Sequence, residues 1–251
     1  MRELEREPRQ DIPLPRRLAI VGAGRLGRAL SSTLTAAGVA VVGPLGREAD
    51  LARADAVMLC VPDGEIAAAA ASLPGGLVVG HPSGATALEV LAPHERFVLH
   101  PLMTVAFTGA ELGGAGVTIA GSTPRALAYA RSLADALRMQ AVELADEDRA
   151  VYHAAASVAS NFLLTLEDAA EQLSALAGVR REMLVPLVRA TVENWAAHGA
   201  AEVLTGPIAR GDERTVAAHR EAIGARAPEL LDLYDVLAAH TRALAAQTVP
   251  A

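Results

Sequence analysis

A glycine-rich turn between an apolar run and a helical segment constrains the fold of this chain more than any other feature. The turn reads Gly22-Ala23-Gly24-Arg25-Leu26-Gly27, follows the apolar residues 18–21 and opens a helical pattern over residues 25–37. In such a turn the first glycine permits a tight bend, the second lets a phosphate approach the backbone, and the third lets helix and strand pack closely. The N–H groups and the dipole of the helix start attract phosphate. The turn therefore predicts a dinucleotide site made by these six residues, with a glycine-rich turn in an unrelated α/β protein as the alternative.

The alternation of strand and helix continues to about residue 144. Apolar runs of strand type occupy residues 18–21, 39–42, 56–61, 77–79, 97–99, 117–120 and 141–144. Between them, residues 25–37 and 124–137 have the 3.6-residue apolar spacing of amphipathic helices. Strands that alternate with helices form a parallel sheet covered on both faces. We therefore expect an α/β domain with a doubly wound, mostly parallel sheet.

The strand pattern stops near residue 146, and the remaining segments read as helices. They cover residues 146–177, 180–198, 214–225 and 228–246, with Gly178 and Gly199 at positions where helices commonly end. Aromatic residues make up only 3% of the chain, so its core must use Ala, Leu and Val, which suits close-packed helices and parallel strands. We expect a mobile tail over residues 1–15, a dinucleotide-binding domain over 16–145 and an all-α domain over 146–251 that binds substrate and dimerises.

Composition argues against several classes of function. The formal net charge is −7 and no extended run of Lys or Arg is present, so nucleic-acid binding is not expected. The apolar stretches are shorter than the roughly 20 residues that cross a bilayer, and residues 1–15 lack the apolar core of a signal peptide. The single cysteine, Cys60, lies in an apolar run and is expected to be buried and inert, without a disulfide. We expect a cytoplasmic protein that acts on a small molecule and holds no metal.

The residues after the second predicted strand indicate which dinucleotide binds. An acidic residue there would bind the adenosine ribose of NAD, but the sequence reads Gly43-Pro44-Leu45-Gly46-Arg47. Arg47 can pair with the 2′-phosphate of NADP, and a solvated surface arginine is the alternative. Val61 and Pro62 close the third strand beside the cofactor, and Ser83, or the backbone of its turn, is expected to contact nicotinamide or substrate. Asp63 is expected to cap the next helix.

Short blocks spread along the chain carry a family resemblance. Besides the glycine turn they are Val61-Pro62-Asp63, His81-Pro82-Ser83-Gly84-Ala85, His100-Pro101-Leu102, Tyr152-His153-Ala154-Ala155 with Ser160-Asn161, and Leu204-Thr205-Gly206-Pro207-Ile208-Ala209-Arg210-Gly211-Asp212 with Thr215 and His219. With these blocks the chain resembles the Rossmann-like oxidoreductases whose helical C-terminal half is domain of unknown function 2520. Its layout is more distantly similar to pyrroline-carboxylate reductase, ketopantoate reductase and the hydroxyacid and 6-phosphogluconate dehydrogenases. The resemblance implies NADP-linked reduction of a carbonyl or imine by a Rossmann domain joined to a helical dimerising domain.

Several of these relatives use a lysine and an asparagine four residues apart on the long helix, but this chain has no lysine. On the corresponding helix it carries His153, Ser157 and Asn161, spaced i, i+4 and i+8 and therefore expected along one helical face. A histidine can stabilise a developing alkoxide and deliver a proton at neutral pH, so His153 is the first candidate for the proton donor. Asn161 would orient the substrate oxygen or the nicotinamide amide, and Ser157 would add a hydrogen bond. The alternative is a polar stripe that ties two helices together.

His100 and the loop before residue 212 supply further candidates. His100 follows an apolar strand and is a rival proton donor at the sheet edge, or else it caps a loop through its imidazole. In the loop, Thr205 and Arg210 are expected to bind substrate, with Arg210 holding a carboxylate in a bidentate pair. The alternative is that Arg210 and Asp212 pair with each other and brace the domain junction.

The apolar residues of segment 180–198 indicate how the helices pack and whether two copies of the chain associate. Leu184, Leu187, Val188 and Trp195 are expected to pack in the core between helices. Part of this surface is expected to form a homodimer interface, because so small a helical domain leaves apolar area for a second subunit to cover.

The leading hypothesis from these residues is an NADP-dependent reductase that acts on a carbonyl or imine of a small, carboxylate-bearing substrate, with a ketopantoate-like acid as the first choice. One alternative is a reductase of imines or cyclic imines in specialised metabolism. Another is a dinucleotide sensor without catalysis. The polar residues of the helical half favour an enzyme, because a sensor needs the phosphate-binding turn but not the histidine and asparagine.

Overall fold

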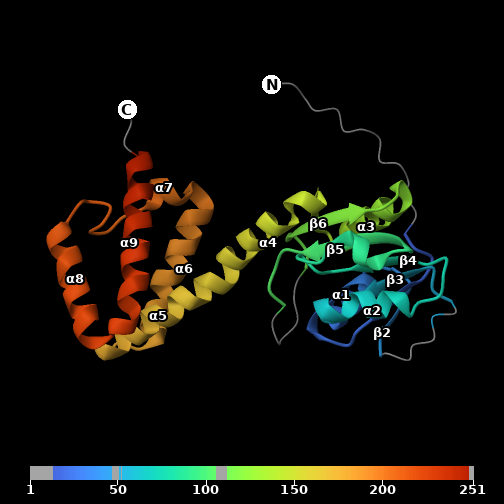
Figure 1. The fold of residues 1–251 in the computed structure, drawn as a ribbon, viewed down its shortest axis with the longest axis horizontal. Helices are drawn as coiled ribbons and strands as arrows, with labels where there is room; N and C mark the ends of the chain where they lie inside the picture. The colour runs from blue at the N-terminus through green and yellow to red at the C-terminus, as the bar shows by residue number, and fades with distance from the viewer. Residues whose placement is uncertain (1–13, 47–50, 52, 106–111, 249–251) are drawn as a thin grey trace, which may run out of the picture. The chain divides into compact units, whose positions relative to one another are not determined.

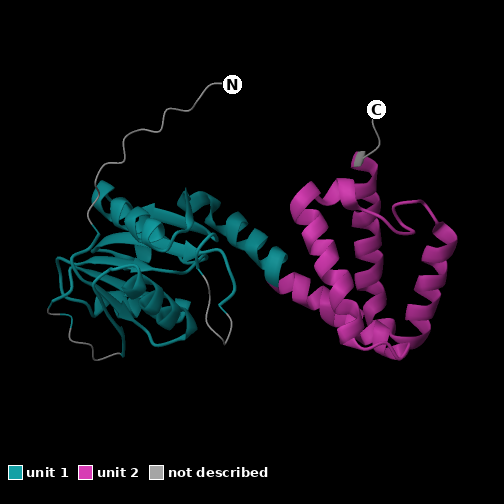
Figure 2. Cartoon of the chain, turned by 180° about the vertical axis from the view of Figure 1, so that it is seen from behind, with its two compact units in different colours: residues 1–160 teal, residues 161–251 magenta. Residues whose placement is uncertain are grey.

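The computed structural model describes residues 14–46, 51, 53–105 and 112–248, which form two compact units, residues 1–160 and 161–251 (Figure 2). Most of the tail expected over residues 1–15 lies outside the described residues, and so does Arg47. The units divide at Ser160, within the helical run that begins near residue 146, where the sequence pattern predicts the domain boundary. The three-part division inferred from the sequence stays a prediction.

Unit 1 is built on a seven-stranded sheet in the order β2-β1-β3-β4-β5-β6-β7 (Figure 1). The strands are β1 (Leu18–Val21), β2 (Val41–Leu45), β3 (Ala56–Leu59), β4 (Val78–His81), β5 (Glu95–Pro101), β6 (Gly116–Gly121) and β7 (Gln140–Glu143). All neighbouring pairs are parallel except β5 and β6, which are antiparallel. The doubly wound, mostly parallel sheet predicted from the sequence is confirmed.

The two faces of the sheet bury separate apolar clusters, as the alternation of side chains along β1 requires. Leu18 and Ile20 belong to a cluster that includes residues of helices α1 (Arg25–Ala36) and α3 (Pro124–Ala136). Ala19 and Val21 belong to a second cluster, on the other face, with Ile66 of helix α2 (Ile66–Ala71). Because helices cover both faces, only the edges of the sheet are left for a ligand.

The chain after β7 is helical. Its elements are the 3-10 turn Asp146–Asp148, α4 (Arg149–Ser157), a π-helical turn (Val158–Phe162), α5 (Leu163–Leu176), α6 (Arg181–His198), α7 (Ala200–Val203), α8 (Glu213–Arg226), the 3-10 turn Pro228–Leu230, α9 (Leu231–Ala245) and the 3-10 turn Ala246–Thr248. The sequence predicts one helix over residues 146–177, whereas the structure interrupts it with the π turn. Gly178 and Gly199 follow α5 and α6 with φ of +76° and +83°, the conformation that favours glycine at a helix end.

Helix α6 does not bury the apolar residues that the sequence assigns to the core. Leu187 is 67% exposed and Trp195 is 56% exposed, while Leu184 and Val188 are half-buried. The prediction of core burial is therefore wrong for Leu187 and Trp195. In fact, neither α5 nor α6 has any buried residue.

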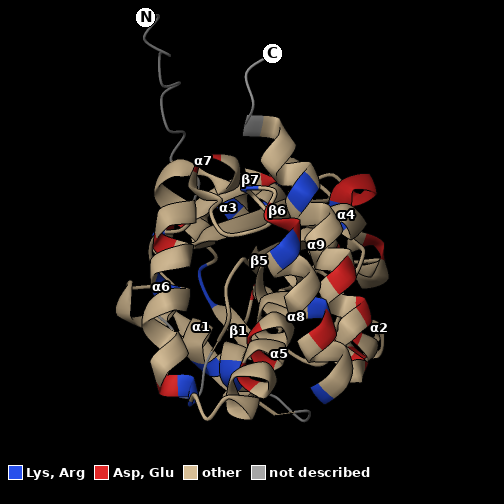
Figure 3. Cartoon of the chain, turned by 90° about the vertical axis from the view of Figure 1, so that its left-hand side faces the viewer, with Lys and Arg blue, Asp and Glu red and all other residues tan. Residues whose placement is uncertain are grey.

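Within the described residues, no helix has both the length and the apolar character needed to cross a membrane. Arginines and carboxylates are interspersed along α8 and α9, as the blue and red segments of Figure 3 show.

Candidate functional site

The carboxyl ends of four parallel strands bring the predicted site residues of unit 1 to one edge of the sheet. Gly22 follows β1, Val61 and Pro62 come shortly after β3, Ser83 comes shortly after β4, and His100 lies near the end of β5. The chain forms β2 on one side of β1 and then crosses over to form β3 on the other side. The winding direction therefore changes beside β1. In open α/β sheets, ligands bind outside the carboxyl ends of the strands at such a switch point.

The first and third glycines of the turn are required by close backbone contacts. Gly22 has φ +112°, and a Cβ placed on it would lie 2.1 Å from the carbonyl oxygen of Cys60. A Cβ on Gly27 would lie 2.0 Å from the carbonyl oxygen of Gly22. Burial raises the pKa of the Cys60 thiol to about 12, so this cysteine is no nucleophile at neutral pH. The backbones at the end of β1, after β3 and at the start of α1 are therefore in close contact at this turn.

The second glycine, Gly24, instead faces open space. A Cβ built on it meets no atom within 4 Å, and Gly24 is the N-cap residue of α1, where no side chain caps the helix. Ala23 and Arg25 beside it are exposed, and Leu26 is half-buried against the core. Since no side chain of the helix start accepts its N–H groups, this turn fits the pyrophosphate of a dinucleotide.

The end of β2 is tied to the same turn. The Gly22 N–H donates to the Leu45 carbonyl at 2.9 Å, and the Ser31 hydroxyl of α1 donates to the Gly43 carbonyl at 3.0 Å. Residues 41–46 contain no carboxylate, so the acid that would bind the ribose of NAD is missing from this strand end. Arg47, the expected partner of a 2′-phosphate, lies outside the described residues.

A hydrogen-bonded loop links the ends of β3 and β4. The Ser83 hydroxyl donates to Asp63 Oδ2 at 2.7 Å and accepts from the Thr86 N–H at 3.0 Å, while the Ser83 N–H donates to His81 Nδ1 at 3.2 Å. The prediction that Asp63 caps a helix is wrong, because α2 begins after Glu65 without a side-chain cap. The expected contact of Ser83, or of its turn, with nicotinamide or substrate stays a prediction, as do those of Val61 and Pro62.

Two histidines expected as rival proton donors come together at this edge. His100 Nδ1 lies 2.7 Å from the Tyr152 hydroxyl of α4, and the His100 and His153 ring centroids are 6.4 Å apart. Gly84 lies against both rings, since a Cβ on it would be 2.9 Å from His100 Nε2 and 2.9 Å from His153 Cδ2. Sequence reasoning missed Tyr152 as a partner of His100, although Tyr152 stands next to His153 in one of the blocks that mark the family.

The electrostatics of the edge keep His100 uncharged at neutral pH. Burial lowers the pKa of His100 to about 4, with the charges of His153 and Arg149 acting in the same direction and that of Asp63 opposing them. Burial raises the pKa of Tyr152, against the neighbouring hydroxyl of Thr118 and the charge of Arg149. At pH 7 the phenol therefore keeps its proton and the imidazole lacks its second one.

Arg149 supplies the buried positive charge beside these rings. It is 3% exposed and donates from Nε and Nη2 to Asp146 Oδ1 at 3.0 and 2.7 Å. His81 lies in the same electrostatic surroundings, and burial lowers its pKa to about 4 as well. The edge therefore holds two neutral imidazoles, His81 and His100, near one paired guanidinium.

The three polar residues expected on one α-helical face do not share a regular α-helix. Ser157 ends α4 and donates its hydroxyl to the His153 carbonyl at 3.0 Å. Asn161 lies in the π turn, and a π turn holds more residues than an α turn, so the i+8 spacing no longer gives the α-helical phase. Asn161 belongs to unit 2, whereas His153 and Ser157 belong to unit 1.

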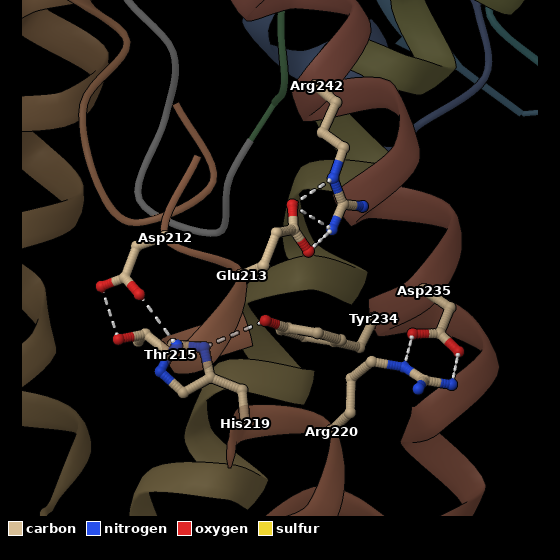
Figure 4. Close-up of polar contacts among 8 residues, drawn as sticks. All are labelled: Asp212, Glu213, Thr215, His219, Arg220, Tyr234, Asp235 and Arg242. Atoms are coloured by element: carbon tan, nitrogen blue, oxygen red, sulfur yellow. Dashed lines mark hydrogen bonds and ion pairs between the residues drawn. The ribbon is translucent and has the colours of Figure 1, made fainter. Parts of the chain in front are cut away.

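The loop of unit 2 that carries Thr205 and Arg210 leads into α8, and both residues are exposed. Asp212 is the N-cap of α8 and accepts from the Thr215 N–H at 3.1 Å and the Thr215 hydroxyl at 2.7 Å (Figure 4). The Thr215 bonds lower the pKa of Asp212, with a further contribution from the charge of Arg210. The Asp212 carboxylate thus starts a helix, which leaves the role of Arg210 in substrate binding as a prediction.

Polar pairs join α8 to α9 (Figure 4). His219 Nδ1 lies 3.0 Å from the Tyr234 hydroxyl, and Arg220 makes two bonds to Asp235 at 2.6 and 2.8 Å. Arg242 holds Glu213 at 2.8 to 3.1 Å. These pairs, from the start and the middle of α8, therefore tie the two helices together.

Solved structures with this fold are found in several organisms. The chain is similar to a candidate NADP oxidoreductase of Bacteroides fragilis (TM-score 0.76, 19% identity, 90% of this chain and 97% of that one). It is also similar to a protein of Thermotoga maritima (TM-score 0.76, 24% identity, 92% and 98%) and to a reductive aminase of Aspergillus terreus solved with NADPH and ethyl levulinate (TM-score 0.65, 13% identity, 92% and 94%). At these identities the likeness shows the fold, and no curated protein matches the chain.

The family is shown by a match to residues 115–241, which run from the start of β6 through most of α9 and make up just over half of the chain. The matching family model is described as a domain of unknown function, DUF2520. It includes the block with Tyr152 and His153 and the block that ends at Asp212. The resemblance inferred from these blocks is confirmed, and the chain belongs to the DUF2520 family.

Proposed function

We propose that this protein is an NADP-dependent oxidoreductase that reduces a carbonyl or imine group of a small substrate. One observation carries the proposal: the open phosphate-binding turn at Gly24 and the His100–Tyr152 pair lie at the same carboxyl edge of one sheet. Three strand spacings, roughly 14 Å, separate β1 from β5, so a ligand that reaches both must extend along the edge. A dinucleotide has this extended form.

The turn and the end of β2 would hold the cofactor. Gly24 and the first N–H groups of α1 would receive the pyrophosphate, and Arg47 would pair with the 2′-phosphate. Bound NADPH would supply the hydride. Val61, Pro62 and the turn at Ser83, which follow β3 and β4, would face the nicotinamide end.

The two histidines would act differently on the substrate. A neutral His100 can donate a hydrogen bond from its ring, which favours the oxygen or nitrogen that gains charge during reduction. His153 is the proposed proton donor, because it lies half-buried on α4 beside His100. Ser157, Asn161, Thr205 and Arg210 are proposed substrate contacts, with Arg210 as the partner of a carboxylate.

A substrate screen tests the function directly. Purified protein would be mixed with NADPH and a panel of 2-keto acids, ketopantoate first, and of cyclic imines, and NADPH oxidation would be followed by absorbance. We expect turnover of at least one class and a stronger preference for NADPH than for NADH. His153→Ala should lose most of this activity, while the exposed His198→Ala serves as a matched control in the same chain.

The outcomes separate the alternatives. Preferred turnover of cyclic imines would favour an imine reductase of specialised metabolism over a keto-acid reductase. Tight NADPH binding in calorimetry without turnover on any carbonyl or imine would favour a dinucleotide sensor. Absence of NADPH binding would overturn the proposal as a whole. If NADH bound as well as NADPH, and Arg47→Ala changed neither affinity, the assignment of Arg47 would fail.

We also propose that two copies associate through unit 2. Among the described residues of this unit, the buried apolar residues are only Val216, Ile223, Ala227 and Ala238. Along α6, by contrast, Met183 is 65% exposed, Leu187 67% and Trp195 56%, at spacings of four and eight residues that place them on one helical face. A second copy that packs on this face would supply the missing core.

Analytical ultracentrifugation at micromolar concentration tests this association. We expect a dimer for the natural chain and a monomer for Leu187→Glu, with the exposed Arg189→Glu on the same helix as a control that changes charge away from the apolar stripe. A natural chain that sediments only as a monomer would contradict the proposal.

A further inference from the structure

Tyr152 connects the first turns of α4 to the imidazole at the end of β5. Its hydroxyl lies 2.7 Å from His100 Nδ1, and the two rings meet edge to face, with centroids 5.6 Å apart and planes at 89°. The contact spans 52 residues of sequence. A hydrogen bond of this length occupies Nδ1 of the ring and leaves Nε2 for a different partner.

Both members of the pair are uncharged at neutral pH, so the direction of this bond depends on which tautomer His100 adopts. Burial raises the pKa of Tyr152 and lowers that of His100 to about 4, so near pH 7 a protonated phenol faces a neutral imidazole. A neutral imidazole has one N–H and one nitrogen that accepts. If the phenol donates to Nδ1, the proton of His100 must be on Nε2.

The second ring nitrogen of His100, Nε2, is the one left for a ligand. Among the residues that the structure describes, no hydrogen-bond partner lies on His100 Nε2, and Gly84 packs beside this side of the ring, since a Cβ on it would lie 2.9 Å from Nε2. The charged and titratable groups that act on the ring are His153 and Arg149 from α4 and Asp63 from the turn after β3. An N–H at this atom would be the hydrogen-bond donor that the proposed reduction requires.

We propose that Tyr152 is a positioning residue that donates its hydroxyl proton to His100 Nδ1 and thereby holds His100 in the Nε2–H form, with this N–H directed at the electronegative atom of the substrate. The part of the proposal that concerns substrate rests on the proposed function. The part that concerns the tautomer depends only on the protein itself. The two parts therefore have separate readouts.

Long-range proton–nitrogen NMR on protein labelled with nitrogen-15 in histidine reads the tautomer of each ring without cofactor or substrate. The His100 signals would be assigned by their loss in His100→Gln. We expect the Nε2–H pattern for His100 in the natural protein at pH 7. In Tyr152→Phe, loss of a bond of about 1 kcal/mol would shift the tautomer ratio roughly fivefold toward Nδ1–H. An Nδ1–H pattern in the natural protein would overturn the proposal, and this measurement needs no variant that might fold poorly.

The chain contains a matched control in the second histidine–tyrosine pair. His219 and Tyr234 make the same Nδ1-to-hydroxyl contact at 3.0 Å and the same edge-to-face packing, but on the exposed side of α8. Tyr234→Phe should leave the tautomer of His100 unchanged. If it changed the His100 pattern as much as Tyr152→Phe does, the effect would be global and the proposed role of Tyr152 would fail.

Kinetics test the catalytic part once a substrate is known. Tyr152→Phe should lower kcat roughly fivefold, change KM little and leave NADPH affinity intact, because the lost bond orients a donor that acts on the transition state. An unchanged kcat with a shifted tautomer would show that the N–H does not act in reduction. If no substrate turned over at all, the proposed function would fail while the tautomer result still decided the role of Tyr152.

Discussion

Asp63 and Ser83 are joined by a hydrogen bond of 2.7 Å across 20 residues of sequence. The bond connects the turn after β3 to the turn after β4, two strands that pair in parallel. Ser83 is 6% exposed, and its hydroxyl also accepts from the N–H of Thr86. A single side chain therefore holds together the two loops that would carry the nicotinamide end of the cofactor.

Removing this hydroxyl should destabilise unit 1. Ser83→Ala leaves the Asp63 carboxylate and the Thr86 N–H without their partner, and we expect a loss of about 1–2 kcal/mol in the free energy of unfolding, measured by urea denaturation. Ser72→Ala is the control, since the Ser72 hydroxyl makes an exposed bond to the Ala69 carbonyl and should matter by less than about 0.5 kcal/mol. Equal losses in the two variants would contradict the structural role of Ser83.

Filling Gly84 should displace the two imidazoles. In Gly84→Ala the added Cβ would lie 2.7 Å from His100 Cε1 and 2.9 Å from His153 Cδ2, so at least one ring must move. We expect a destabilisation of about 1–3 kcal/mol and changed NMR signals of both histidines. Gly75→Ala meets no atom within 4 Å and should change neither quantity. Unaltered His100 and His153 signals in Gly84→Ala would contradict this prediction, because they would mean that the turn moves and the rings do not.

The glycines of the first turn should separate stability from cofactor binding. Gly27→Ala places a Cβ 2.0 Å from the Gly22 carbonyl oxygen and should lower thermal stability strongly. Gly24→Ala points a methyl into open space, so we expect nearly normal stability but NADPH affinity weakened about tenfold, or ~1.4 kcal/mol, in calorimetry. Full NADPH affinity in Gly24→Ala would contradict the placement of the pyrophosphate.

Unit 1 should lose stability as the pH falls from about 6.5 toward 4. In the folded chain the pKa of His81 and of His100 lies at about 4, whereas the unfolded residues have the ordinary value near 6.5. Between these values the unfolded state binds more protons, so the free energy of unfolding decreases with falling pH and levels off below about 4. Guanidinium unfolding at pH 7.5 and pH 5 should show a smaller difference in His100→Gln, while the exposed His219→Gln should keep the full difference. An identical pH dependence in the natural chain and His100→Gln would contradict the assigned pKa.

The sheet could be predicted well because its signals are local. Six of the seven predicted runs are followed by glycine, proline or a polar residue, and all seven runs form strands. The largest error in position is at β2, which the sequence ends at residue 42 because Gly43 and Pro44 are typical of turns. The strand continues to Leu45, since it is the outermost strand and its free side tolerates a proline.

The contacts of the candidate site were harder to predict because they join distant parts of the chain. Nothing near Tyr152 in the sequence indicates that its hydroxyl reaches His100. Likewise, nothing near Asp63 indicates that its carboxylate accepts a hydrogen bond from Ser83 and does not cap a helix. The interruption of the helix at Val158–Phe162 is also absent from the sequence pattern, because this segment contains neither glycine nor proline. The sequence nevertheless identified His100 and His153 as the pair to compare, and the structure brings their rings together.

The proline in β2 also limits how these molecules can aggregate. A strand at the border of a sheet exposes unpaired N–H and carbonyl groups, on which an extended chain from a neighbouring molecule can form new hydrogen bonds. At Pro44 there is no N–H to offer, so a foreign strand could not pair continuously along this border. Strand-by-strand growth into fibrils is thereby discouraged on this side of unit 1.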